Sequence, residues 1–172
     1  MRYITMFGSS IPVEGDEQYR IAYETGQMIA KAGYGVCSGG NKGIMEAASR
    51  GAVDAGGEAL GITVSAFPHS NKYLTKQINC TTLFERITKL IASGDAYIIL
   101  QGGTGTLLEL AAVWELINKN LLPPKPAAAH SPLWSGIIPL MEKQIISEGR
   151  LSGLIKTFDD HRAMMEYILN EL

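Results

Sequence analysis

The segment Ala96-Tyr-Ile-Ile-Leu-Gln-Gly-Gly-Thr-Gly-Thr-Leu-Leu-Glu109 decides the fold of this 172-residue chain. Its first five residues form an uninterrupted apolar run, which is typical of a strand buried on both faces of a parallel sheet. A glycine-rich loop follows, and from about Leu107 to Asn118 apolar side chains recur at helical spacing. The segment therefore predicts a strand, a loop and a helix in direct succession, which is the repeating unit of an α/β protein.

The same order of elements recurs along the rest of the sequence. The other predicted strands are Tyr3–Phe7, Gly35–Cys37, Glu58–Val64, Ile78–Thr82, Ala127–His130 and Ile155–Phe158. Helices are predicted from about Asp16 to Gly33 and from Ile44 to the Gly56-Gly57 pair. A third helix follows the Ile78–Thr82 strand and ends at Ser93, and two more cover Trp134–Glu148 and Asp159–Leu172. We interpret residues 1–172 as one α/β domain: a three-layer, Rossmann-like, doubly wound, mostly parallel sheet with helices on both faces.

Periodicity also predicts which side of each helix is buried. The first helix has a core stripe in which Gly26 allows close packing on the sheet, comprising Tyr19, Ala22, Tyr23, Gly26, Ile29 and Ala30. The helix after the quoted loop has a stripe of Leu107, Leu110, Ala111, Trp114 and Ile117. In the helix before the quoted strand, the apolar residues Ile87, Leu90 and Ile91 face the core, and the charged residues Glu85, Arg86 and Lys89 point elsewhere.

Composition narrows the possible partners. A net charge of −2 and a pI near 5.9 argue against a nucleic-acid partner. No apolar stretch approaches the ~20 residues that span a bilayer and no secretory signal is visible, so we expect a cytoplasmic protein without a membrane partner. Cys37 and Cys80 are expected to be buried free thiols. His69, His130 and His161 are scattered without ligand spacing, so we expect no metal site and no cofactor.

Three glycine-rich loops follow predicted strands, and the carboxyl ends of parallel strands share one edge of a sheet. The loops are Gly8-Ser-Ser10, Ser38-Gly-Gly-Asn-Lys-Gly43 and Gly102-Gly-Thr-Gly-Thr106. Two of them open onto helix N-termini, where free N–H groups favour an anion. We therefore predict that a small-molecule nucleotide binds here through its phosphate, held by Gly8, Ser9, Gly39, Gly40, Gly43, Gly102, Gly103, Thr104, Gly105 and Thr106.

Other interpretations of these loops are weaker. Thr106-Leu-Leu-Glu109 and Thr82-Leu-Phe-Glu85 both match a helix capping box, but capping does not explain three glycines before Thr106. The loops carry neither a dinucleotide fingerprint nor the Gly-Lys-Ser/Thr ending of a P-loop. The loop from Ser65 to Lys76 is either a lid over the site or a plain crossover.

Taken in order, these motifs resemble the LOG (Lonely Guy) family, whose members are often labelled lysine decarboxylases. The resemblance covers about the first 150 residues. It rests on Phe7-Gly-Ser-Ser10, Ser38-Gly-Gly-Asn-Lys-Gly-Ile-Met-Glu46, Gly56-Gly57, Glu85-Arg86 and Gly102-Gly-Thr-Gly-Thr-Leu-Leu-Glu109. A decarboxylase would need a Schiff-base lysine for pyridoxal phosphate, and no lysine stands out here.

The resemblance implies a hydrolase that cleaves the N-glycosidic bond of a nucleoside 5′-monophosphate, such as AMP or a cytokinin riboside monophosphate. It implies catalytic roles for Arg86 and Glu109, and a homodimer with active sites near the subunit interface. A carboxylate suits this chemistry because it stabilises an oxocarbenium-like transition state and orients water. An arginine suits it because its fork binds phosphate or ribose oxygens.

Two residues depart from the family pattern. Gln101 replaces a proline, and Ile87 replaces a lysine that we expect to lie beside the substrate. These departures keep a second function open, namely a nucleotide-binding or molybdenum-cofactor-binding carrier that has no turnover.

Overall fold

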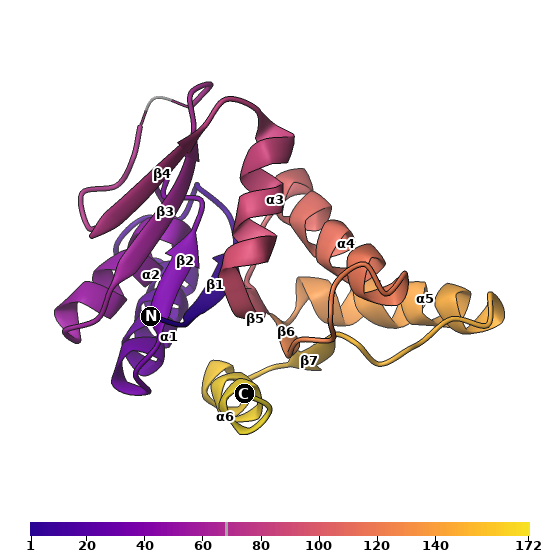
Figure 1. Cartoon of the computed structure of the whole chain (residues 1–172). Helices are drawn as coiled ribbons and strands as arrows, with labels where there is room; N and C mark the ends of the chain where they lie inside the picture. Colours follow the sequence, from indigo (N-terminus) through magenta and orange to yellow (C-terminus); the bar gives the residue numbers. More distant parts are fainter. Residues whose placement is uncertain (68) are drawn as a thin grey trace.

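A computed structural model describes residues 1–67 and 69–172 of the chain (Figure 1). Seven strands and six helices lie within these residues. The strands are β1 (Tyr3–Phe7), β2 (Gly35–Ser38), β3 (Ala59–Val64), β4 (Lys76–Cys80), β5 (Gly94–Ile99), β6 (Ala127–His130) and β7 (Lys156–Phe158). The helices are α1 (Glu17–Lys31), α2 (Ile44–Asp54), α3 (Leu83–Ser93), α4 (Thr104–Asn118), α5 (Leu133–Ser147) and α6 (His161–Asn170).

All seven strands join one sheet in the order β4-β3-β2-β1-β5-β6-β7, and every neighbouring pair is parallel. The chain first winds outward from β1 to β4, then crosses back and winds outward from β5 to β7. The order therefore reverses between β1 and β5, which is the position where ligands bind in open sheets of this kind. The predicted Rossmann-like, doubly wound fold is confirmed.

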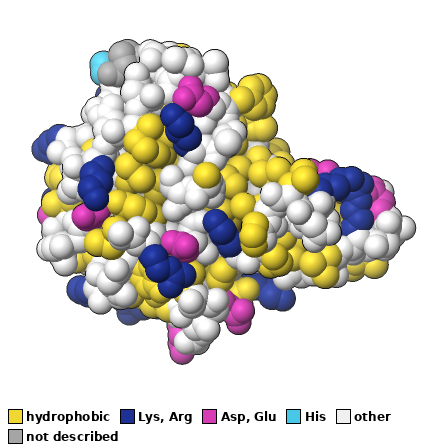
Figure 2. Space-filling view, in the orientation of Figure 1, with side chains coloured by type: hydrophobic (Ala, Val, Ile, Leu, Met, Phe, Trp, Pro, Cys, Tyr) yellow, Lys and Arg dark blue, Asp and Glu magenta, His cyan; other side chains and the backbone are white. Residues whose placement is uncertain are grey.

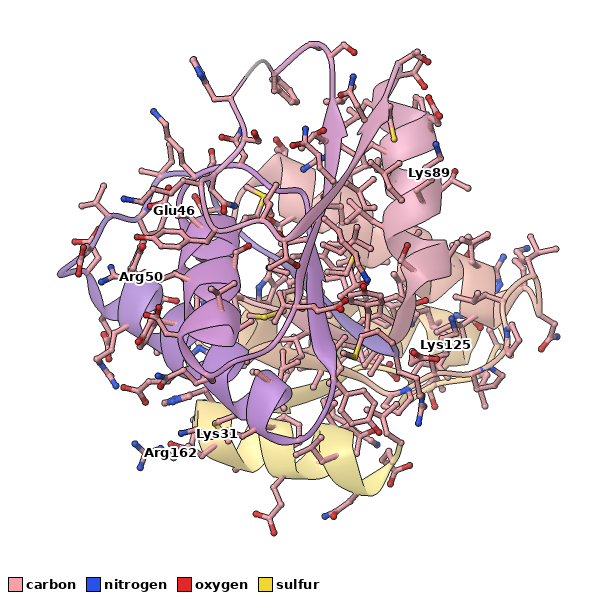
Figure 3. The ribbon with its side chains drawn as sticks, turned by 60° about the vertical axis from the view of Figure 1, so that its left-hand side comes forward. Lys31, Glu46, Arg50, Lys89, Lys125 and Arg162 are labelled. Carbon is pink, nitrogen blue, oxygen red and sulfur yellow. The ribbon has the colours of Figure 1, made fainter. Side chains whose placement is uncertain are left out.

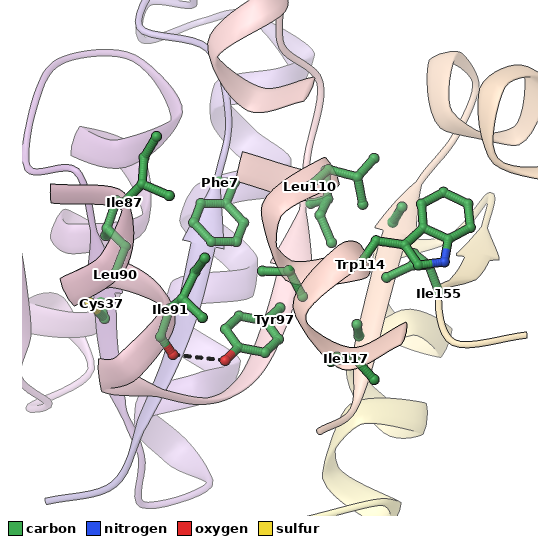
Figure 4. Close-up of a cluster of buried hydrophobic side chains, with 14 of the residues drawn as sticks. Phe7, Cys37, Ile87, Leu90, Ile91, Tyr97, Leu110, Trp114, Ile117 and Ile155 are labelled. Atoms are coloured by element: carbon green, nitrogen blue, oxygen red, sulfur yellow. Dashed lines mark hydrogen bonds between the residues drawn. The ribbon is translucent and has the colours of Figure 1, made fainter. Parts of the chain in front are cut away.

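Side chains that alternate along each strand supply two separate cores, which makes the protein three-layered. On one face Phe7, Tyr97 and Ile99 pack with residues of α3, α4 and α5 (Figure 4). On the other face Ile4, Ile98 and their neighbours pack with residues of α1, α2 and α6. The Tyr97 hydroxyl, which is buried, donates a hydrogen bond of 2.7 Å to the Ile91 carbonyl.

Several element boundaries differ from the prediction by one to three residues, and two of these differences bear on the site. Strand β4 ends at Cys80 instead of Thr82, because Thr82 caps α3 by accepting a hydrogen bond from the Glu85 N–H at 3.1 Å. Helix α4 begins at Thr104 instead of Leu107, so Thr106 lies inside the helix. The capping box at Thr106 is therefore wrong; at Thr82 the N-cap is confirmed, while the Glu85 carboxylate accepts from the Thr81 N–H, at 2.8 Å, and not from Thr82.

The predicted buried side of α4 is also partly wrong, since Leu107 and Ala111 are exposed. The buried residues are Thr106, Glu109, Leu110, Val113, Trp114 and Ile117. This helix is apolar on nearly every side, so hydrophobicity alone did not reveal which side faces inward. Two polar side chains on its inner side, Thr106 and Glu109, line the cavity described below.

Helices α1 and α2 lie against each other through two glycines. A β-carbon at Gly26 would overlap the carbonyl oxygen of Ala48, and one at Gly51 would overlap the carbonyl oxygen of Tyr23. The close approach predicted for Gly26 is thus made to α2 and not to the sheet. Since α2 begins at the end of the β2 loop, this contact fixes one wall of the site described below.

We predict that Gly26→Ala lowers the free energy of unfolding by about 1–3 kcal/mol, because the new methyl group has no room. Gly136→Ala is the matched control: this glycine also lies within a helix, and a β-carbon there meets no described atom within 4 Å. The control should leave stability unchanged or raise it by up to about 1 kcal/mol. Urea unfolding of both variants tests the prediction, and equal stabilities would contradict it.

Candidate functional site

The site lies where the strand order reverses. The Ser9 N–H donates to the Gln101 carbonyl at 2.9 Å, and the Leu100 N–H donates to the Phe7 carbonyl at 2.9 Å. These bonds hold the loops after β1 and β5 side by side. The Ile44 N–H, at the start of α2, donates to the Ser9 carbonyl at 2.9 Å and brings the β2 loop to the same place. The three glycine-rich loops meet at one edge, as predicted.

Several loop glycines are required by close contacts within the protein. Gly43 has a φ of 70°, and a β-carbon there would overlap the backbone of Ser9 and Ser10. A β-carbon at Gly39 would overlap the Arg86 guanidinium, and one at Gly102 would overlap the Thr106 hydroxyl. These three glycines therefore allow residues of the site to pack closely against the loops.

Gly103 and Gly105 differ from the other loop glycines. Both are exposed, and a β-carbon at either position would meet no atom of the described residues within 4 Å. Gly103 is the N-cap of α4, and the Leu107 N–H makes the first helical bond, to the Gly103 carbonyl at 3.0 Å. The N–H groups of Thr104, Gly105 and Thr106 precede that bond, so they are free to bind an anion at the positive end of the helix.

A cavity of about 420 Å³ opens in front of these N–H groups, within the size range of small-molecule sites. Eight of the twelve predicted site residues line it, and Gly39, Gly40, Gly43 and Gly102 lie behind its wall. Four further residues line it that the predicted set lacks. The lining residues are Gly8, Ser9, Ser10, Asn41, Met45, Phe67, Arg86, Gly103, Thr104, Gly105, Thr106 and Glu109.

The four additional residues carried a partial signal in the sequence. Ser10, Asn41 and Met45 lie within the glycine-rich segments already singled out by their pattern. Phe67 lies in the loop after β3, where periodicity gives no information about side-chain direction. Only the folded chain shows that this loop reaches the cavity.

Arg86 is a buried residue of the site and not a solvated helix charge. Its Nε donates to the Ile62 carbonyl at 2.8 Å, and Nη2 lies 3.9 Å from the sulfur of Met45. Nη1 lies 3.8 Å from Oε1 of Glu109. The bond to Ile62 of β3 holds the Nε edge of the guanidinium. The Nη atoms are left to contact Glu109 and a ligand in the cavity.

Glu109 is buried on α4, one turn after the free N–H groups. Burial raises the pKa of its carboxyl to about 7, against an opposing effect of the Arg86 charge. A carboxyl that titrates near neutral pH can exchange protons with a ligand under ordinary conditions. This explains why a polar side chain occupies the inner side of an apolar helix.

Ile87 does not line the cavity, contrary to the expected position of this residue beside the substrate. The side chain is 6% exposed and belongs to the core with Phe7 and Leu90 (Figure 4). Consecutive residues of a helix point about 100° apart, so Arg86 faces the cavity while its neighbour faces inward. The absence of lysine at position 87 therefore removes no charge from the cavity.

Gln101 joins the glycine-rich loop to the next strand. Its side-chain Nε2 donates to the carbonyls of His130 and Ser131, at 2.9 and 2.8 Å. A proline at this position could not make these bonds. The amide thus fixes the loop by hydrogen bonds.

The remaining candidates lie outside the cavity. Cys37 and Cys80 are buried free thiols, as predicted. His130 is buried at the end of β6, His69 is exposed, and His161 pairs with Glu24 on α1 at 2.9 Å. Among residues 1–67 and 69–172 no cluster of histidine, cysteine and acidic side chains could hold a metal ion.

The loop from Ser65 to Lys76 contains Pro68, which lies outside the described residues. Its second half is anchored to the site. The Asn71 N–H donates to the Gly40 carbonyl at 2.8 Å, and the Asn71 side chain donates to the Asn41 carbonyl at 3.0 Å. Leu74 packs against Gly40 and Gly61. The anchored half therefore supports the turn at Gly40 and Asn41, of which Asn41 lines the cavity.

The surface charges are dispersed. In Figure 3, Arg50, Lys89 and Lys125 lie apart from one another, while Lys31 on α1 and Arg162 on α6 lie close together. On the face shown in Figure 2, Lys and Arg side chains alternate with hydrophobic and acidic ones, so this face carries no continuous basic patch. In the described part of the chain, no helix combines the length and hydrophobicity that a bilayer span requires.

Comparison with known proteins places this site in context. The model of the SLOG cluster4 family matches residues 1–122. An uncharacterized protein of Archaeoglobus fulgidus is 35% identical over 96 residues, which are 56% of this chain and 64% of that protein. A cytokinin riboside 5′-monophosphate phosphoribohydrolase of Rhodococcoides fascians is 29% identical over 115 residues, 64% of this chain and 58% of that enzyme. Each match thus spans less than two thirds of the relative.

A solved structure matches almost the whole chain. The molybdenum cofactor binding protein of the phototrophic bacterium Rippkaea orientalis is 26% identical, with a TM-score of 0.75. The match covers 98% of this chain and 94% of that protein. The similar proteins thus include one named as a phosphoribohydrolase and one named as a cofactor-binding protein.

The raised pKa of Glu109 predicts a pH-dependent stability. The unfolded chain releases this proton near pH 4.5 and the folded protein near pH 7, so the folded state is weakened as the pH rises between these values. Glu109→Gln does not titrate. Its unfolding free energy relative to wild type should therefore rise by roughly 3 kcal/mol between pH 4.5 and 8. Urea unfolding of both proteins across this range measures the difference, and parallel pH curves would contradict the assignment.

Proposed function

Because the chain belongs to the SLOG cluster4 family, we propose that it hydrolyses the N-glycosidic bond of a nucleoside 5′-monophosphate, releasing a free base and ribose 5-phosphate. One observation carries the proposal. A single cavity combines an open helix N-terminus with a buried carboxyl that titrates near neutral pH beside a buried guanidinium. The first suits a phosphate, and the second suits chemistry on the attached sugar.

In this proposal the phosphate binds the N–H groups of Thr104, Gly105 and Thr106, with the Ser9 loop beside it. The two open glycines leave room for phosphate oxygens to approach the backbone closely. Inside a helix, a glycine such as Gly105 is less favourable than alanine by up to about 1 kcal/mol. Since packing against the described residues does not require a glycine there, close contact with a ligand is the best reason for its presence.

The reaction assigned to Glu109 and Arg86 is a displacement at the anomeric carbon. A water oxygen bonds to C1′, the bond from C1′ to the base nitrogen breaks, and the base leaves with the bonding electrons. The Glu109 carboxylate stabilises the positive charge that develops on the sugar and accepts the proton of the attacking water. The departing base nitrogen takes up a proton from solvent, and Glu109 releases the proton it accepted to solvent, which restores the carboxylate. Arg86 binds an oxygen of the ribose or phosphate and favours the ionised form of Glu109.

A non-catalytic carrier is the second candidate. The likeness to the molybdenum cofactor binding protein along nearly the whole chain favours it. A carrier would be stabilised by its ligand without forming a product. At 100 times the dissociation constant, the ligand should raise the unfolding free energy by about 2.7 kcal/mol. Stabilisation by AMP or a pterin phosphate without base release would support this candidate over the hydrolase.

We also propose that the chain forms a homodimer through the helices that border the cavity. Leu83 and Phe84 on α3, with Leu107 and Leu108 on α4, are exposed, and the two helices run side by side (Figure 1). Apolar surface of this kind is typical of an interface. Sedimentation equilibrium tests the proposal: a monomer mass at micromolar concentration would reject it.

The hydrolase prediction is tested by incubating the protein with AMP and measuring free adenine. Glu109→Gln should reduce base release at least 100-fold, because it removes the proton acceptor. AMP should still bind, since the N–H groups of α4 are unchanged. Glu115→Gln, an exposed glutamate on the same helix, is the control and should retain full activity. Base release by wild type no faster than by Glu109→Gln would reject the hydrolase.

A further inference from the structure

Phe67 presents an aromatic ring at the rim of the cavity. The side chain is 51% exposed, so the core does not need it. It lines the 420 Å³ cavity and also a smaller neighbouring hollow of about 280 Å³. Exposure alone is common for single apolar side chains, but the position of this ring on the wall of a ligand-sized cavity makes it available to a bound ligand.

The backbone of Phe67 is held in place by the end of β3. Its N–H donates to the Val64 carbonyl at 2.9 Å, which forms a tight turn. The Ser65 N–H donates to the Cys80 carbonyl at 3.0 Å and ties the turn to β4. The backbone that carries the ring is therefore held at the carboxyl edge of the sheet.

Sheet topology sets the distance between this ring and the phosphate-binding turn. Phe67 follows β3 and the turn follows β5, with β2 and β1 between them. Three strand spacings separate the two, roughly 14 Å. A ligand that touches both must be extended, with an anion at one end and an apolar group at the other.

The chemistry of the cavity changes along this line. Free N–H groups lie at the β5 end, Arg86 and Glu109 lie on the helices beside it, and Met45 and Phe67 supply apolar surface. The polar groups behind Phe67 are already paired: Gln77 donates to the Thr63 hydroxyl and Asn79 donates to the Ser65 hydroxyl, both at 3.0 Å. At the β3 end of the site Phe67 thus supplies an aromatic face, beside a hollow whose other lining residues are mostly polar.

We propose that Phe67 stacks on the planar ring of the ligand, and so selects nucleoside monophosphates over ribose phosphates that lack a ring. This inference rests on the proposed function, because it takes the phosphate to lie on α4. Stacking requires only a π face, so adenine and guanine should be accepted alike. Phe67 is then a specificity-determining residue.

The test measures the affinity for AMP and for ribose 5-phosphate by calorimetry in the Glu109→Gln background, which leaves AMP intact. Phe67→Ala should weaken AMP binding roughly tenfold and leave ribose 5-phosphate binding unchanged. Phe67→Trp should keep the affinity for AMP. Leu121→Ala, which truncates an exposed apolar side chain outside both the cavity and the proposed dimer surface, is the matched control and should change neither affinity.

The outcomes separate this inference from the proposed function. Unchanged AMP binding by Phe67→Ala, or an equal loss for both ligands, would overturn the stacking role even if wild type releases adenine. The expected selective loss, in a protein whose wild type releases no adenine, would support stacking and reject hydrolysis. Failure of AMP to bind at all would overturn both.

Discussion

The reversal of strand order between β1 and β5 is the constraint on which the rest of the structure depends. Two adjacent parallel strands are joined by the hydrogen bond from Ser9 to Gln101, yet their following helices pack on opposite faces of the sheet. The loops must therefore diverge beyond that bond. The crevice between them is a consequence of the reversal in strand order, and the residues of the candidate site lie around this crevice.

Two features of the crevice work against stability. Glu109 is buried with its one charged partner, Arg86, 3.8 Å away, and Gly105 occupies the first turn of a helix where alanine would fit. A buried carboxyl and a helical glycine that packing does not require each weaken the folded state. Proteins keep such features where a ligand or a reaction requires them. The coincidence of both within one cavity is thus the strongest physical argument that the cavity is functional.

The sequence predicted most of the fold, because continuous apolar strands and glycine-bounded helices leave few alternatives. It also identified Arg86 and Glu109, but through resemblance and not through their surroundings. Helical phase was harder to predict, since α4 is apolar on nearly all sides and its inward side carries Thr106 and Glu109. Position 87 was wrongly expected to lie beside the substrate, because comparing a motif position by position does not show which way a side chain points from its helix.

Phe67 illustrates the remaining limit of sequence reasoning. A single aromatic residue in a connecting loop has no periodic neighbours, so nothing local indicates that it reaches a cavity. Its role depends on distant hydrogen bonds, such as those that tie the loop to β4 and to the β2 loop. Tertiary contacts of this kind are set by the whole fold.

Substitution of Gly105 tests the central claim most directly, namely that the open start of α4 binds the phosphate of a nucleotide. Gly105→Ala has room in the described structure and should leave the free energy of unfolding unchanged or raise it by up to about 1 kcal/mol. Its methyl group should nevertheless obstruct the approach of a phosphate to the backbone. The account predicts a more stable protein with at least tenfold weaker AMP binding. A stable variant that binds AMP as tightly as wild type would contradict it.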